Sequence, residues 1–113
     1  MTPRLTSRIE VSALIRTVEG RGGHGMVLAK GDGDAGAILL LITERGVPHA
    51  LLERALTISG DYGWRRAGPQ NIADYQEINP YIEDRRRVDA DLWVVELDVA
   101  GVERFTAEMI AMG

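Results

Sequence analysis

The longest uninterrupted apolar run of the sequence, Ala37 to Ile42, most restricts how this chain can fold. It is far shorter than the roughly 20 residues needed to cross a bilayer. Polar and glycine-rich segments bound it on both sides, which is typical of a strand. Because the run has no polar face, both of its sides must be covered, as in the centre of a sheet. We therefore predict a central strand over residues 37–43.

Turn residues divide the neighbouring segments into further short strands. Gly31 to Asp34, Glu44 to Gly46 and Ser59 to Gly63 combine glycine with polar or charged residues, a composition typical of turns. The periodicity of the run from His49 to Ile58 fits either a strand or a helix, and the turns on both sides favour a strand. The sequence thus predicts an antiparallel meander with strands over residues 25–30, 37–43, 49–58 and 64–66.

A helix is predicted before this meander. Ser7 and Glu10 have the spacing of a capping box, in which each side chain accepts from the backbone amide of the other residue. Gly20 tolerates positive φ and is a natural end for the helix, so we predict it over residues 7–19. Its apolar face consists of Val11, Leu14, Ile15 and Val18, which recur at helical spacing.

The C-terminal third is predicted to return to helix around one more strand. Asn71 is a suitable cap. Pro80 lacks an amide and clashes with the carbonyl four residues before it, so the helix should break there. We expect helices over residues 71–78 and 80–88, a strand over 92–99 and a last helix over 101–112. The inward residues of that last helix are predicted to be Val102, Phe105, Met109 and Met112.

The element order α-β-β-β-β-α-β-α predicts the α+β class. Strands that follow one another before the chain returns to helix form a mostly antiparallel sheet, here of about five strands, with helices packed on it. At 113 residues the chain fits one domain, so we assign residues 1–113 to a single α+β domain.

Composition narrows the compartment and the partners. The absence of cysteine excludes disulfides and thiolate ligands. An amphipathic N-terminal stretch stands where a signal peptide would have its apolar core, so we expect a cytoplasmic protein that does not enter a membrane. A net charge of −4 disfavours broad binding to nucleic acid or anionic membranes, because both require neutralisation of phosphates.

Motifs for cofactors, metals and nucleophiles are weak. The glycine-rich stretches 20–25 and 31–36 match a dinucleotide fingerprint by spacing, but neither is predicted to follow a strand and open a helix. The aspartates of the second stretch lack the other ligands of a calcium loop. His24 and His49 lie in different segments, without the spacing of a paired metal motif. We therefore expect no cofactor and no metal, and we leave the catalytic residues unassigned.

The segment from Asp89 to Asp98 is the strongest candidate for a functional site. If Trp93 faces the core, Glu96 and Asp98 share the opposite face of the strand with apolar residues. A covered carboxylate needs a cationic partner, a metal or a raised pKa. An arginine partner or an exposed edge position is the favoured interpretation. The candidate functional residues are Arg85, Arg87, Asp91, Trp93, Glu96 and Asp98.

Segments spread along the chain share a pattern with a known family. They are Pro3–Leu5, Ala13–Arg16, Lys30–Asp32, Asp34–Leu39, Leu52–Arg54, Trp64, Arg85–Arg87 and Asp89–Glu96. This pattern resembles the uncharacterised bacterial domain-of-unknown-function family DUF1491 over nearly the whole chain. The family often has proline where this chain has Ala90, a minor departure. The resemblance implies a one-domain bacterial protein and brings no activity, so no functional residue is carried over.

Two classes of function follow. Because the residues form no coherent catalytic set, the leading hypothesis is a non-catalytic binding or regulatory module. Its partner is unknown, and self-association, for example as a homodimer, would use an exposed strand edge or the methionine-rich last helix. The alternative is a small metal-dependent hydrolase acting on a phosphorylated or nucleic-acid substrate, with Asp91, Glu96 and Asp98 on the metal and arginines 85–87 on the anion. Its carboxylates must converge within about 2.0–2.6 Å of one point.

Overall fold

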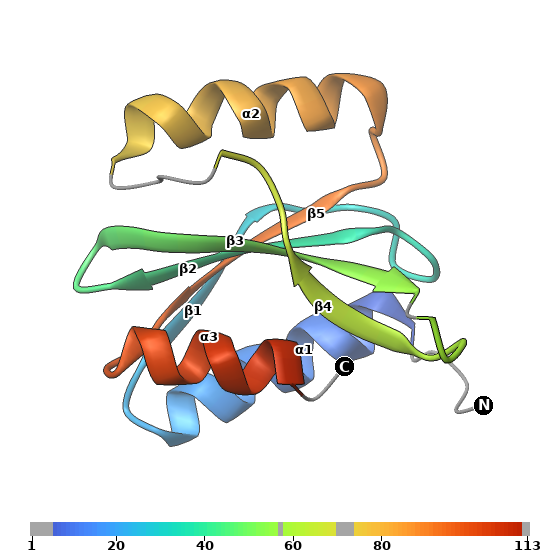
Figure 1. Cartoon of the computed structure of the whole chain (residues 1–113). Helices are drawn as coiled ribbons and strands as arrows, with labels where there is room; N and C mark the ends of the chain where they lie inside the picture. The colour runs from blue at the N-terminus through green and yellow to red at the C-terminus, as the bar shows by residue number, and fades with distance from the viewer. Residues whose placement is uncertain (1–5, 57, 70–73, 112–113) are drawn as a thin grey trace.

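A five-stranded sheet with three helices forms the protein (Figure 1), as seen in a computed structural model that describes residues 6–56, 58–69 and 74–111. The elements are α1 (Ser7–Gly20), β1 (His24–Ala29), β2 (Ile38–Glu44), β3 (Val47–Leu56), β4 (Tyr62–Arg66), α2 (Tyr75–Val88), β5 (Trp93–Asp98) and α3 (Val102–Ala111). This order confirms the predicted α+β class. The strands are arranged β1-β5-β2-β3-β4, and every neighbouring pair is antiparallel except β2 and β5.

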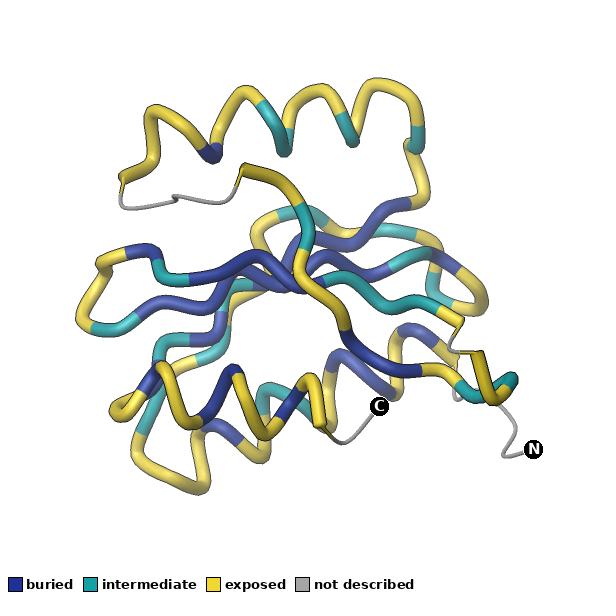
Figure 2. The backbone as a smooth tube through the Cα atoms, in the orientation of Figure 1, coloured by how far each residue is buried: buried dark blue, intermediate teal, exposed yellow. Residues whose placement is uncertain are grey.

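The sheet is the middle of three layers. Helices α1 and α3 cover one face, and α2 covers the other (Figure 1). Residues 38–43 of β2 are all buried, which confirms the central strand. Figure 2 shows the same concentration of buried residues in the middle strands, whereas α2 and the strand β1 at the edge of the sheet are largely exposed.

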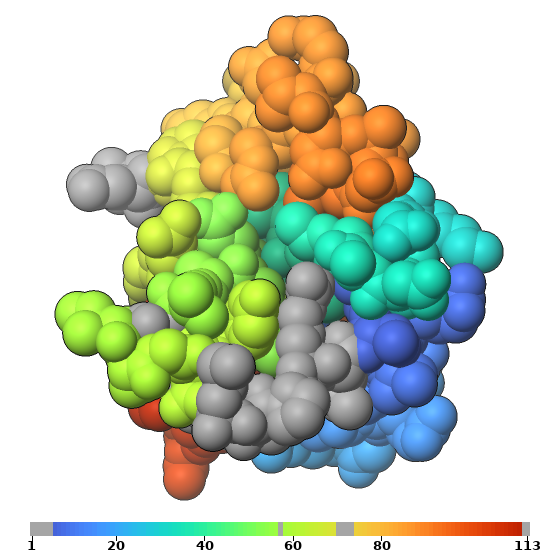
Figure 3. Space-filling view, turned by 90° about the vertical axis from the view of Figure 1, so that its right-hand side faces the viewer, coloured from blue at the N-terminus to red at the C-terminus, as the bar shows by residue number. Residues whose placement is uncertain are grey.

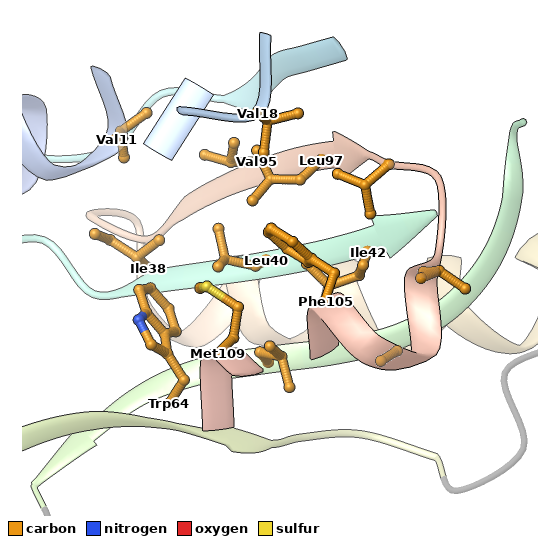
Figure 4. Close-up of a cluster of buried hydrophobic side chains, with 14 of the residues drawn as sticks. Val11, Val18, Ile38, Leu40, Ile42, Trp64, Val95, Leu97, Phe105 and Met109 are labelled. Atoms are coloured by element: carbon orange, nitrogen blue, oxygen red, sulfur yellow. The ribbon is translucent and has the colours of Figure 1, made fainter. Parts of the chain in front are cut away.

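The larger core lies under α1 and α3 (Figure 4). Alternate residues of β2 and β5 point into it, as the two-residue period of a strand requires. Each such aliphatic side chain contributes about 1.5–3 kcal/mol by leaving water. The labelled side chains of this core are Val11, Val18, Ile38, Leu40, Ile42, Trp64, Val95, Leu97, Phe105 and Met109.

A smaller core lies under α2. It consists of Leu39, Leu41, Leu51, Ile78, Leu92 and Val94, with Tyr81 and Ile82 packed against it. Ile78 is the one fully buried residue of α2. The helix therefore depends on a narrow apolar contact and on the polar contacts beside it.

The predicted break at Pro80 is wrong, because α2 is one continuous helix over Tyr75–Val88. It begins at Asp74, whose side chain accepts from two amides of the first turn at 3.0 and 3.3 Å. The predicted cap, Asn71, lies outside the described residues. Proline removes one backbone bond to the Gln76 carbonyl. Packing against the sheet outweighs that single loss, and the proline itself is exposed.

The capping box predicted for α1 is also wrong. Thr6 occupies the cap position, and no side chain caps the helix. The buried Ser7 hydroxyl donates to the carbonyl of Gly36. Glu10 turns towards the sheet, where its Oε1 lies 2.7 Å from Nη1 of Arg54 on β3. The pattern identified the start of the helix correctly, but the side chains of Ser7 and Glu10 bind partners outside the helix.

The predicted antiparallel meander holds for β2, β3 and β4 but is wrong for β1, because β5 lies between β1 and β2 and pairs with both. The remaining elements agree with the prediction apart from their ends. The ambiguous run is a strand, and its residues Leu51 and Leu52 face opposite cores. β4 starts at Tyr62, two residues before the predicted start. The inward face of α3 is confirmed for Val102, Phe105 and Met109, whereas Met112 lies outside the described residues.

Candidate functional site

The candidate residues form two groups at the two ends of β5. Asp91 precedes this strand and Asp98 ends it, so at about 3.3 Å per residue they lie roughly 20 Å apart along the chain. Arg85 and Arg87 are in the last turn of α2, which leads into the Asp91 end. In the part of the chain that is described, no three His, Cys, Asp or Glu side chains are arranged to hold a metal ion. Asp91 therefore does not share a site with the two later carboxylates.

Arg85 connects α2 to the sheet. Its Nη1 donates to Glu53 Oε2 at 2.8 Å and to the Tyr81 hydroxyl at 2.9 Å. Arg65 of β4 reaches the other oxygen of Glu53, with Nη2 and Oε1 2.8 Å apart. Burial by itself raises the pKa of Glu53, but the hydrogen bonds and charges of the two arginines outweigh it and hold that pKa below its ordinary value. Arg85 thus connects α2 with β3 directly, and with β4 through the shared partner Glu53.

The other members of this first group make local contacts. Arg87 pairs with Asp84 one helical turn earlier, at 2.9 Å, and both side chains are exposed. The Asp91 carbonyl accepts from the Asp32 amide at 3.1 Å. Trp93 faces the larger core as predicted, and its Nε1 donates to the Asp32 carbonyl at 2.7 Å. In the space-filling view, the end of α2 and the turn after it (orange) meet the loop between β1 and β2 (Figure 3).

The second glycine-rich stretch, residues 31–36, lies in this loop between β1 and β2. A Cβ atom on Gly31 or Gly36 would lie 2.1 or 2.3 Å from the Asp91 carbonyl oxygen, so no larger residue fits at either position. The stretch joins two strands, as its turn composition indicated. Close backbone approach accounts for these glycines.

Glu96 and Asp98 form the second group and lie on the α2 side of the sheet, as the alternation predicted. Both are half-buried. The expected arginine partner is wrong for Glu96, whose Oε2 accepts from the Thr43 hydroxyl at 3.0 Å. Asp98 accepts from the amides of Arg45 at 2.9 Å and Gly46 at 2.8 Å, in the turn between β2 and β3. Neutral donors therefore hold both carboxylates in place.

These carboxylates affect the groups around them. Burial raises the pKa of Asp98, but the turn amides, the neighbouring hydroxyl and the charge of His24 together lower it below its ordinary value. The pKa of Tyr75, at the start of α2, is raised by burial and then by the negative charges of Glu96 and Asp98. The phenol of Tyr75 thus stays protonated well above neutral pH.

We call Glu19, Glu96 and Asp98 the acidic corner. They line an open depression of about 360 Å³, together with His24 and Met26 of β1. The sequence did not indicate that His24 belongs here, because its proximity to Asp98 arises from the antiparallel pairing of β1 with β5. Thr43 and Tyr75 were likewise not predicted, and no local signal in the sequence identifies these three residues as neighbours of the acidic corner.

The comparisons with known proteins agree with this fold and with the absence of an assigned chemistry. A family model described as a protein of unknown function, DUF1491, matches residues 5–107. The chain belongs to the DUF1491 family. The resemblance inferred from the sequence is thereby confirmed, and the DUF1491 description assigns no activity to the residues above.

Solved structures of two bacterial proteins share the fold. A crystal structure of a family member from Caulobacter crescentus is 33% identical, with a TM-score of 0.74, and the match covers 84% of this chain and 88% of that one. A protein from A. tumefaciens, solved in solution, is also 33% identical, with a TM-score of 0.70 over 88% and 90% of the two chains. No curated protein matches the chain. None of the helices that the structure describes combines the length and apolar character of a membrane-spanning segment.

Proposed function

We propose that this DUF1491 protein is a non-catalytic binding module that receives an extended segment of a partner protein along β1. One observation carries the proposal. Among the described strands, β1 has a neighbour on its β5 side alone, and Met26, Val27 and Leu28 are 61%, 39% and 44% exposed. An edge strand presents backbone N–H and C=O groups that can pair with an added strand, and apolar side chains stabilise the addition.

The two edges of the sheet differ in the features that prevent pairing. Charged residues, proline and bulges normally protect an edge strand. At the β4 edge, the two arginines Arg65 and Arg66 are exposed. The β1 edge contains no proline, Asp, Glu, Lys or Arg over residues 24–29, and its register with β5 shifts between Val27 and Ala29. The shift is a bulge at Leu28, which is one protective feature that this edge does have, but the apolar Leu28 side chain remains exposed.

The alternative, a small metal-dependent hydrolase acting on a phosphorylated or nucleic-acid substrate, has less geometric support. Of its three carboxylates, Glu96 and Asp98 lie together, and each already accepts hydrogen bonds from the protein. Its proposed anion-binding residue Arg85 is paired with Glu53 near the other end of β5. His24 beside the acidic corner is the observation that retains this candidate, because imidazole with carboxylates is a common set of metal ligands.

A peptide titration tests the proposed binding mode. The probe is a capped eight-residue peptide of alternating valine and threonine, and the control peptide has proline in place of each threonine. We expect NMR shifts and slower amide exchange at residues 24–29 with the first peptide alone, because strand addition protects the outward amides. Met26→Lys should weaken this binding and Val47→Lys should not, since the two side chains are similarly exposed at 61% and 59%.

The same samples test the hydrolase. Addition of Mn²⁺ would broaden the signals of His24, Glu96 and Asp98 if these residues bind a metal. The hydrolase would replace the binding module on two results together. These are Mn²⁺-dependent cleavage of bis(4-nitrophenyl) phosphate and no change at β1 when the valine–threonine peptide is added.

A further inference from the structure

We infer that the strand received by β1 is β1 of a second copy of this chain, paired antiparallel in a two-fold symmetric dimer. The inference rests on the proposed function and names its partner. It depends on the charges at the two ends of β1. The acidic corner, with Glu19, Glu96 and Asp98, adjoins the N-terminal end at His24. Lys30, the one lysine of the sequence, directly follows the C-terminal end and is exposed.

Within one chain these opposite charges cannot meet. His24 and Lys30 are separated by about 20 Å of extended chain, at about 3.3 Å per residue. Salt at physiological concentration screens exposed charges beyond about 8 Å. His24 already lies beside Asp98, and a partner strand is needed to bring Lys30 to an acidic corner along this edge.

A two-fold axis perpendicular to the sheet near Val27 provides that cation twice. The axis reverses the direction of the second β1, so the C-terminal end of each strand lies beside the N-terminal end of the other. Lys30 of each copy then lies next to the acidic corner of its partner. Parallel pairing would place like ends together and bring the two acidic corners side by side, so the charges select the antiparallel arrangement.

The middle of β1 meets the same symmetry requirement. An interface around a two-fold axis must be self-complementary, because the same patch is used by both copies. Met26, Val27 and Leu28 lie at the centre of the strand and are exposed. The rotation places Val27 next to Val27 of the second copy, and Met26 next to its Leu28. The resulting sheet is continuous through both copies. A ladder of at most six residues with a bulge at Leu28 is a small interface, so we expect a dimer that depends on protein and salt concentrations.

A charge exchange between copies tests this arrangement. By sedimentation equilibrium we expect a dimer whose association weakens as salt is added. Lys30→Glu places a glutamate against the acidic corner at both contacts. Glu19→Lys places a lysine next to Lys30 of the partner copy at both contacts, beside the remaining Glu96 and Asp98. Each variant should associate roughly tenfold more weakly or worse. An equimolar mixture of the two variants should recover association, because each heterodimer contact then pairs one glutamate with one lysine. Glu103→Lys, an exposed change of the same kind on α3, should leave association unchanged.

The outcomes separate this inference from the proposed function. Recovery in the mixture supports the dimer, as does dissociation of the wild-type dimer by the valine–threonine peptide. A protein that stays monomeric at millimolar concentration overturns it, and so does a dimer that Lys30→Glu and Glu19→Lys leave unchanged. If the monomeric protein still binds the peptide at β1, self-pairing is wrong and the binding module stands. If it binds no peptide either, both proposals fail.

Discussion

Replacing Arg85 by methionine removes the guanidinium that connects α2 to β3. The side chain is 27% exposed and that of its partner Glu53 is 17% exposed, so water screens this pair less than a surface pair. Methionine retains an apolar stem of similar length, which keeps the packing along α2 largely in place. The variant therefore isolates the loss of the charged contacts to Glu53 and Tyr81.

The expected loss can be worked out from these contacts. A hydrogen bond that involves a charged group contributes about 1.5–3 kcal/mol. Arg65 still reaches Glu53, but its own side chain is 68% exposed, and pairs of that kind contribute about 0–1 kcal/mol. We therefore expect Arg85→Met to lower the free energy of unfolding by about 2 kcal/mol. For a domain of this size the midpoint of thermal unfolding should fall by roughly 10 °C.

Urea and thermal unfolding of three proteins check the value. Arg86→Met is the matched control, because Arg86 is the next residue of the same helix and is exposed. It should change the free energy of unfolding by less than about 0.5 kcal/mol. Equal effects of the two variants would refute the structural role of Arg85. A loss of phosphate binding in Arg85→Met, with stability unchanged, would instead favour its use as an anion-binding residue.

Three further perturbations test the rest of the fold. The pKa of Glu53 is lower in the folded protein, so its charge stabilises the fold above a pH of about 4.5, and this contribution is lost as the pH falls through the folded pKa. Glu53→Gln should therefore flatten the dependence of the unfolding free energy on pH in that range. An unchanged slope would contradict this. Ile78→Ala should cost about 2–5 kcal/mol in urea unfolding, whereas Val88→Ala, at an 83% exposed position, should cost less than about 0.5 kcal/mol. Trp93→Phe removes the donor to the Asp32 carbonyl and should cost about 1–3 kcal/mol, a loss that wild-type stability in the variant would disprove.

Local patterns predicted most of the fold correctly. The apolar run that became β2 required cover on both faces, and the structure provides a helix layer on each side. Strict alternation along β5 assigned Trp93 to one face and Glu96 to the other, because successive side chains of a strand point in opposite directions. The errors occurred where a local rule competed with packing. Pro80 was expected to break α2, and Ser7 with Glu10 to cap α1. Tertiary contacts decided both cases: α2 packs on the sheet, Ser7 donates to Gly36 in the loop before β2, and Glu10 pairs with Arg54 of β3.

The candidate site could be predicted only in part. The sequence showed that Glu96 and Asp98 share a face, which needs no knowledge of neighbouring strands. Their partners depend on the insertion of β5 between β1 and β2, which brings His24 and Thr43 beside Asp98. The separation of Asp91 from these residues likewise follows from the extended conformation of β5.

By itself, the sequence determined the element types, their order and the two faces of β5, because these depend on the period of apolar residues along a few turns or strand steps. Tertiary structure alone decided which strand lies at the edge. The run from Met26 to Leu28 is apolar like a core segment, and nothing in its own residues distinguishes a covered strand from an edge strand. The sheet order leaves it exposed and brings Glu96 and Asp98, which are distant in the chain, to the end of β1 opposite Lys30. The interaction surface that we propose for this protein is therefore a property of its topology.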